Sequence, residues 1–228
     1  MQANLEIPGA HALRAARNDM SGLTTGGHAK RGSSVGLLVM VVGLVLFLGA
    51  HVFTTGRAAR ARAVAAMGEG TYKIVYSVVA LAGLALICWG FSHYRADGWI
   101  QVWTPPKALK HLNIALMLPA VILVVAAYIR GNIYARLKHP MLAGVKLWAF
   151  GHLLANGDLG GIILFGSILA WAVYDRISLK RRTDPGSPPI PVGGIGNDVI
   201  AVVVGIIAYL ALAFAFHPVV LGIPVMGG

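Results

Sequence analysis

The sequence predicts an all-α, polytopic membrane protein: a helical bundle with about six transmembrane helices. Of its 228 residues, 57% are hydrophobic and only 12% are charged, about half the charged fraction of a typical soluble domain. Apolar runs recur along nearly the whole chain and are continuous, which favours helices over the alternating strands of a membrane barrel. The net charge is +11, but the basic residues gather in the tail and the connectors. That distribution is typical of membrane topology and not of nucleic-acid binding.

The apolar runs divide the chain into a tail and a transmembrane domain. Residues 1–35 lack hydrophobic periodicity and are rich in Gly, Ser, Ala and Arg, so we expect a disordered tail. The transmembrane domain is expected to cover residues 36–222. Its six predicted spans are residues 35–55, 71–91, 109–129, 141–155, 159–174 and 199–220. The fourth and fifth are short, so one or both are candidates for a partly re-entrant segment.

The basic residues of the connectors predict how the bundle is oriented. A helical basic segment follows the first span, and six spans place both termini on one side of the membrane. The first, third and fifth connectors together carry 12 Lys and Arg, against 7 on the other side. Because positive charge marks the cytoplasmic side, we expect the odd-numbered connectors in the cytoplasm of a bacterium and the spans in its inner membrane.

One apolar stretch, residues 143–166, contains polar groups at membrane depth. They are Lys146, His152, Asn156 and Asp158. Ionisable groups are costly in hydrocarbon and are usually retained for function. Trp148, His152 and Asn156 are spaced by four and therefore share one helix face.

Histidines are the strongest candidates for a cofactor site. Four could act in or near the bilayer: His51, His139, His152 and His217. Two facing imidazoles can hold haem iron, and an apolar helix bundle suits a porphyrin. His51 and His152 are the favoured pair, at predicted depths of about 10 and 17 Å, with His139 as the alternative metal ligand. The simpler interpretation of any one buried histidine is a hydrogen bond between helices.

The chain resembles the NnrU family, which includes the plant 15-cis-zeta-carotene isomerases, over about residues 36–222. The matching motifs are His51 with the arginines after it, Gly68-Glu69, Tyr72-Lys73-xx-Tyr76-Ser77, His93-Tyr94-Arg95-xx-Gly98, His139-Pro140-xxx-Gly144-xx-Leu147-Trp148, His152-Leu153-xxx-Gly157-Asp158 and Leu164-Phe165-Gly166. The resemblance implies an integral membrane protein. In the plant enzymes, haem b lies between two histidines, which correspond to His51 and His152, and a carotenoid double bond is isomerised. Bacterial members are associated with denitrification and nitric oxide metabolism. The chain departs from the plant pattern at Trp171, where those enzymes have a further histidine.

Three functions are compatible with these observations. The first is a haem b membrane protein that acts on a polyene or a small gas ligand, in its enzymatic form a haem-dependent cis-trans isomerase, with Trp148 and Asn156 beside the haem. The second is a non-enzymatic factor for assembly of, or delivery to, a nitrogen-oxide reductase. The third is a small transporter that uses Lys146, His152 and Asp158 as a polar relay.

Overall fold

Helices form nearly all of the secondary structure. The computed structural model describes residues 10–182, 191–222 and 225, with side chains from residue 33 onward, and no strand is formed in these ranges. The elements in chain order are α1 (Ala10–Thr55), α2 (Arg57–Met67), α3 (Glu69–Ala96), α4 (Lys107–Ala126), α5 (Asn132–Leu137), α6 (Pro140–Ala155), α7 (Leu159–Lys180), α8 (Ile195–Ala211), the π-helix η1 (Leu212–Phe216) and α9 (His217–Val220).

Five segments of the described chain are long and apolar enough to cross a membrane. They are the Ser33–Thr55 part of α1, then α3, α4, α7 and the segment Ile195–Val220. The helix α6 is as apolar but has 16 residues, which gives a length of about 24 Å against a hydrocarbon core of about 30 Å. It lies between α4 and α7 and is the sixth helix. The predicted polytopic helical bundle is therefore confirmed.

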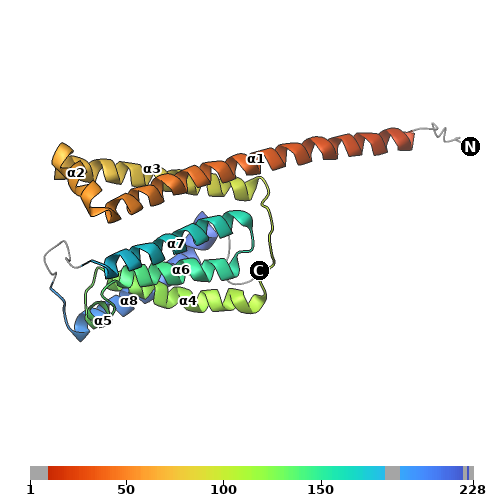
Figure 1. Cartoon of the computed structure of the whole chain (residues 1–228). Helices are drawn as coiled ribbons and strands as arrows, with labels where there is room; N and C mark the ends of the chain where they lie inside the picture. Colours follow the sequence, from red (N-terminus) through yellow and green to blue (C-terminus); the bar gives the residue numbers. More distant parts are fainter. Residues whose placement is uncertain (1–9, 183–190, 223–224, 226–228) are drawn as a thin grey trace, which may run out of the picture.

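The six long helices form a curved array and not a closed ring. Their order in space is α3, α1, α7, α6, α4 and α8, each packed against the next. In Figure 1 the α1/α3 pair lies on one side of the array, and α7, α6, α4 and α8 lie on the other. The helix α7 packs against both α1 and α6, so it lies between the helices that carry His51 and His152.

Glycines allow α1 and α3 to pack with their backbones in contact. A Cβ atom on Gly43 of α1 would lie 2.6 Å from the backbone nitrogen of Ile87, and one on Gly83 of α3 would lie 2.7 Å from that of Phe47. Small residues at such crossings are typical of helix pairs in membranes, where close van der Waals packing replaces the hydrophobic effect. The helices α1 and α3 are thus closely packed against each other.

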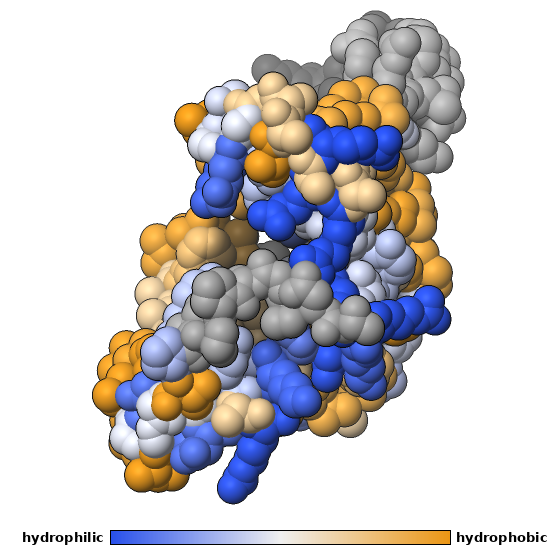
Figure 2. Space-filling model, turned by 60° about the vertical axis from the view of Figure 1, so that its left-hand side comes forward, coloured by the Kyte–Doolittle hydropathy of each residue, from blue (hydrophilic) through white to orange (hydrophobic). Residues whose placement is uncertain are grey.

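The two ends of the bundle differ in their connectors. At one end, which we call the basic end, lie α2, α5 and residues 175–182 at the end of α7. Figure 2 views the molecule with this end brought forward and shows hydrophilic side chains gathered there. At the other end, the closed end, the α3–α4 connector (residues 97–106) crosses the α6–α7 turn (residues 156–158). Backbone hydrogen bonds join them, from Val102 N to Gly157 O (2.8 Å) and from Leu159 N to Ile100 O (2.9 Å).

Three segments differ from the sequence prediction. The helix α1 begins at Ala10 and so includes much of the tail predicted to be disordered; that part contains several Ala and Arg residues, which favour helix. Residues 1–9 of the tail lie outside the described residues. The helix α7 continues to Lys180, six residues beyond the predicted end of the fifth span at residue 174. Charged residues mark where a span leaves the bilayer, but the helix itself can continue past them. The last span changes to a π-helix before Pro218, which cannot donate a backbone hydrogen bond.

Candidate functional site

His51 lies near the basic end of α1 in an aromatic environment. Its Nδ1 atom is 2.7 Å from the carbonyl oxygen of Phe47, one turn earlier. Its ring packs edge-on against Trp171 of α7 (centroids 5.2 Å apart) and Tyr76 of α3 (5.7 Å). A proton on Nδ1 that is donated to the carbonyl fixes the tautomer and leaves Nε2 with a lone pair.

Two buried polar atoms on the residues around His51 have no hydrogen-bond partner in the part of the chain that the structure describes. They are Nε1 of Trp171 and the hydroxyl of Tyr72, one helical turn from Tyr76. Buried donors of this kind are uncommon, because most buried polar atoms in folded proteins have a hydrogen-bond partner. Trp171 is also the position at which the plant enzymes are expected to have a further histidine, and here its indole faces His51.

His152 has the same local geometry as His51 but lies in a different part of the bundle. Its Nδ1 atom is 2.9 Å from the carbonyl oxygen of Trp148. Its ring packs on Phe165 of α7 (4.6 Å) and on Trp148 (5.2 Å). Trp148 in turn contacts Phe165 and belongs to the hydrophobic core around it. The Nε2 atom of His152 is thus left available beside a largely apolar wall.

The structure does not bring His51 and His152 together. Metal–nitrogen bonds are about 2 Å long, so two imidazoles that share one ion hold their ring nitrogens about 4 Å apart. His51 lies four residues before the end of α1, and His152 lies twelve residues after the start of α6, which gives depths of about 6 and 18 Å from the basic end.

The contacts with α7 agree with that separation. His51 contacts Trp171 and His152 contacts Phe165, which are six residues apart, about 9 Å along α7 and on different faces of it. This arrangement does not fit one iron held by both histidines, so their pairing stays a prediction.

His217 is the histidine that the fold places near His152. The two lie within electrostatic range of each other. Nδ1 of His217 is 2.7 Å from the carbonyl oxygen of Leu212, across the π-helix, so it too has Nε2 free. π-Helices often occur at functional sites. A signal was present in the sequence: both histidines lie three residues before the end of their helices, at the closed end.

The other predicted site residues have separate positions. Asn156 caps α6 and donates from Nδ2 to the carbonyl oxygen of His152 (2.8 Å), so it fixes the backbone next to the imidazole. His139 is the N-cap of α6, thirteen residues and about 20 Å from His152. It therefore cannot share an ion with His152.

The polar relay of a transporter is not assembled. Asp158 is buried and accepts from Nη1 of Arg95 on α3 (2.9 Å) and from the backbone nitrogen of Gly161 (2.8 Å). Its carboxylate therefore caps α7 and ties α3 to it. Lys146 and His152 are six residues apart on α6 and point about 120° away from each other. Lys146, His152 and Asp158 therefore lie in different surroundings and do not form one connected relay.

The described residues contain no group of three or more His, Cys, Asp or Glu side chains that could hold a metal ion. Sites with two axial histidines remain chemically available, because a porphyrin supplies the other four nitrogen ligands. His152 and His217 each lie three residues before the end of their helices at the closed end, whereas His51 lies near the basic end.

Comparison with known proteins identifies one family. The family model described as NnrU protein matches residues 39–225, which is most of the chain. No curated protein and no solved structure matches the chain.

Proposed function

The chain belongs to the NnrU family, and from this premise we propose that it is a haem b membrane protein in which His152 is one axial ligand. The observation that carries the proposal is the geometry of His152. Its Nδ1 atom is held by the Trp148 carbonyl, and its ring lies between Trp148 and Phe165. Ligating histidines are commonly oriented in this way, by a hydrogen bond from the other ring nitrogen to a carbonyl.

We propose His217 as the second ligand, on the strength of its proximity to His152. His51 is the alternative that the family resemblance implies, and it would need α1 to shift along α7. Asn156 and Trp148 would hold the ligand helix and flank the macrocycle. A bound haem would supply an iron that can change oxidation state and bind a small molecule such as nitric oxide, or polarise a polyene.

Membrane orientation is part of the same proposal. The basic end carries the arginines and lysines of the three odd-numbered connectors, so the positive-inside rule favours a cytoplasmic position for it. His152 and His217 would then lie nearer the outer leaflet of a bacterial inner membrane. A reporter fused after residue 228 tests this, since it should be active only outside the cytoplasm.

The visible spectrum of the detergent-purified protein tests the haem proposal. Protein from haem-replete cells should show a Soret band that shifts on reduction. His152→Ala should abolish the band, and free imidazole should restore it by filling the space of the lost ring. His217→Ala should lose haem or show a five-coordinate spectrum. His111→Ala, at an exposed position on α4, is the matched control and should keep the spectrum.

The outcomes separate the candidate functions. Loss of haem in His51→Ala, with haem retained in His217→Ala, would favour the pair expected from the resemblance. A colourless protein that is well folded and takes up no added haem would overturn the proposal and favour the non-enzymatic assembly or delivery factor. Cis-trans isomerisation needs its own assay, in which the reduced protein is incubated with a cis polyene and the isomers are separated.

A further inference from the structure

A cluster of cations lies at the basic end, away from the histidine pair. His139, at the start of α6, is within electrostatic range of Lys138, of Arg176 on α7 and of Arg182 just after α7, with Asp175 as the acidic group. No ion pair joins these cations to a carboxylate in the described ranges. The Nε atom of Arg182 is buried without a hydrogen-bond partner there, and its Nη2 atom is 3.5 Å from Ser178. The cluster is thus under-neutralised.

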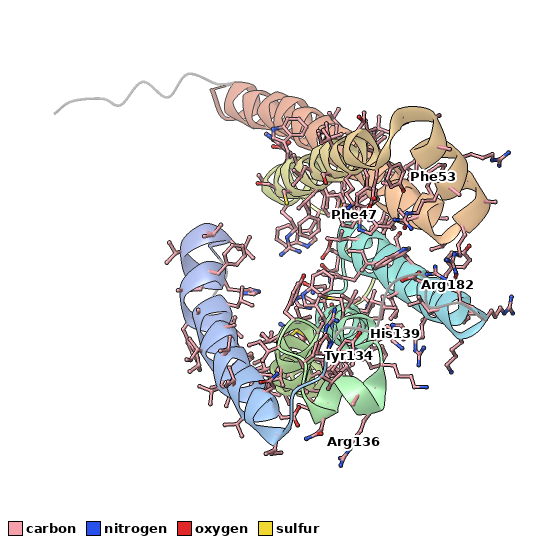
Figure 3. The ribbon with its side chains drawn as sticks, turned by 90° about the vertical axis from the view of Figure 1, so that its left-hand side faces the viewer. Phe47, Phe53, Tyr134, Arg136, His139 and Arg182 are labelled. Carbon is pink, nitrogen blue, oxygen red and sulfur yellow. The ribbon has the colours of Figure 1, made fainter. Side chains whose placement is uncertain are left out.

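The figures show where this cluster lies at the basic end of the bundle. In Figure 3, His139 and Arg182 lie between α1 and α5, while Arg136 points away from the molecule. Figure 2 shows a hollow at the same end, with hydrophilic residues along part of its rim. An anion could therefore approach the cluster from the membrane surface.

An apolar groove leads away from the cluster along α6 and α7. It has a volume of 380 Å³ and is lined by Ala143, Lys146, Leu147, Phe150 and Leu169. The side chain of Phe150 is 46% exposed, so the groove is open to the surface that would face lipid. One charged group, Lys146, interrupts its apolar lining.

The spacing of residues along α6 and α7 indicates that the groove runs toward the cation cluster. Ala143 and Phe150 are seven residues apart and so share one face of α6, and His139 directly precedes the first turn of that helix. On α7, Leu169 and Arg176 are also seven residues apart. Phe150 and His152 are two apart and point in nearly opposite directions, so the groove lies on the side of α6 away from the proposed haem site.

We infer that this groove and the cation cluster bind one anionic phospholipid, with its phosphate at the basic end and an acyl chain along α6 and α7. Charge complementarity argues for this occupant. Arginine guanidinium groups form two parallel hydrogen bonds with phosphate oxygens, and basic pockets between transmembrane helices are typical sites for anionic headgroups. Lys146 can extend its ammonium along the groove toward the same phosphate.

Native mass spectrometry of the full chain in detergent tests the inference. The ligands are phosphatidylglycerol, phosphatidylcholine with the same acyl chains, and inorganic phosphate. The wild-type protein should keep one phosphatidylglycerol at concentrations where phosphatidylcholine is lost. The double variant Arg176→Gln/Arg182→Gln should bind it about thirtyfold more weakly, because each basic residue near a membrane surface contributes about a factor of five.

Two further variants separate charge from groove. The double variant Arg62→Gln/Arg136→Gln removes the same charge at the same end but outside the cluster, and should bind phosphatidylglycerol as the wild type does. Ala143→Phe fills the groove without changing any charge and should weaken phosphatidylglycerol binding.

Three results would overturn the inference. They are equal retention of both lipids, unchanged binding in the Arg176/Arg182 variant, and binding of inorganic phosphate as strong as that of the lipid with no effect of Ala143→Phe. The last result would indicate a site for free phosphate. Haem content, read from the Soret band of each variant, reports on the proposed function separately.

Discussion

The closed end and the basic end of this bundle differ in how far their buried polar side chains are hydrogen-bonded, although Oδ1 of Asn113, in the closed-end half of α4, also has no partner in the described chain. At the closed end, Asp158, Arg95 and Tyr94 are buried or partly buried and satisfied by one another and by the backbone. At the basic end, the Trp171 indole, the Tyr72 hydroxyl and the Arg182 guanidinium each have a buried atom without a partner in the described chain.

The comparison teaches where to look for ligands. A buried polar group that is fully hydrogen-bonded stabilises one conformation, whereas an unsatisfied one costs free energy until something binds it. The closed end therefore joins α3, α6 and α7 into a fixed frame. The basic end, and the imidazole Nε2 atoms of the histidines, are the places where an exogenous group would gain most.

The largest expected effect is at Asp158. Asp158→Ala removes the ion pair with Arg95 and the cap of α7, and should lower the free energy of unfolding by about 3 kcal/mol, at the low end for a buried pair because the Arg95 side chain is 31% exposed. Asp158→Asn keeps a capping group, so its free energy of unfolding should lie between those of the wild type and Asp158→Ala. Glu69→Gln, which removes the exposed pair with Lys73 at the other end, is the control and should leave the midpoint of thermal unfolding in detergent unchanged. Equal midpoints for Asp158→Ala and Glu69→Gln would contradict the closed-end frame.

Tyr94 gives the next largest effect. Its side chain is fully buried, and its hydroxyl accepts from the backbone nitrogens of Ile100 (2.9 Å) and Gly160 (3.1 Å). Tyr94→Phe leaves both donors unpaired and should cost about 2 kcal/mol, measured by denaturant unfolding. Tyr128→Phe, at a side chain that is 76% exposed, should cost nothing measurable. A neutral Tyr94→Phe would mean that water replaces the hydroxyl.

Much of this fold could be predicted from the sequence because a membrane imposes strong local rules. Continuous apolar runs gave the spans, and the basic segment after the first span is α2. The role of Asp158 as an N-cap was also accessible, since Asp directly before a helix is a preferred cap. Its partner Arg95 was not, because 63 residues separate them and no local pattern links their positions.

The histidine pairing shows the limit of depth counting. Counting from predicted helix ends put His51 and His152 about 7 Å apart in depth, but the observed ends increase this to about 12 Å. The insertion of α7 between their helices is a tertiary feature that no single-helix pattern carries. Counting residues back from the helix ends at the closed end would have put His152 and His217 at the same depth. That depth depends only on where their two helices end.

A smaller effect on stability is expected at Trp171, which is one of the residues with an unsatisfied buried atom. Trp171→Phe removes an indole N–H that has no partner in the described residues, so only packing is lost, and the cost should be about 1 kcal/mol or less. The measurement is thermal unfolding beside Tyr94→Phe. A Trp171→Phe variant as destabilised as Tyr94→Phe would mean that the indole N–H is hydrogen-bonded in the membrane, and that the two ends do not differ in the way described here.

The smallest effect is a pH dependence at His139. Burial and the nearby Arg176, with smaller contributions from Arg182 and Lys138, hold the pKa of His139 below its ordinary value of 6.5, and Asp175 opposes them. Because the folded-state pKa is lowered, stability is fully present above about pH 6.5 and falls as the pH drops toward the folded-state pKa, where only the unfolded chain gains the proton. The unfolding midpoint of the wild type should therefore decrease more between pH 7.5 and 5 than that of His139→Gln. An anionic phospholipid in the cluster would favour the imidazolium and should reduce this difference, whereas phosphatidylcholine should not. Identical pH profiles for wild type and His139→Gln would show that the cations do not act on this histidine, and would leave the basic end as a set of independent surface charges.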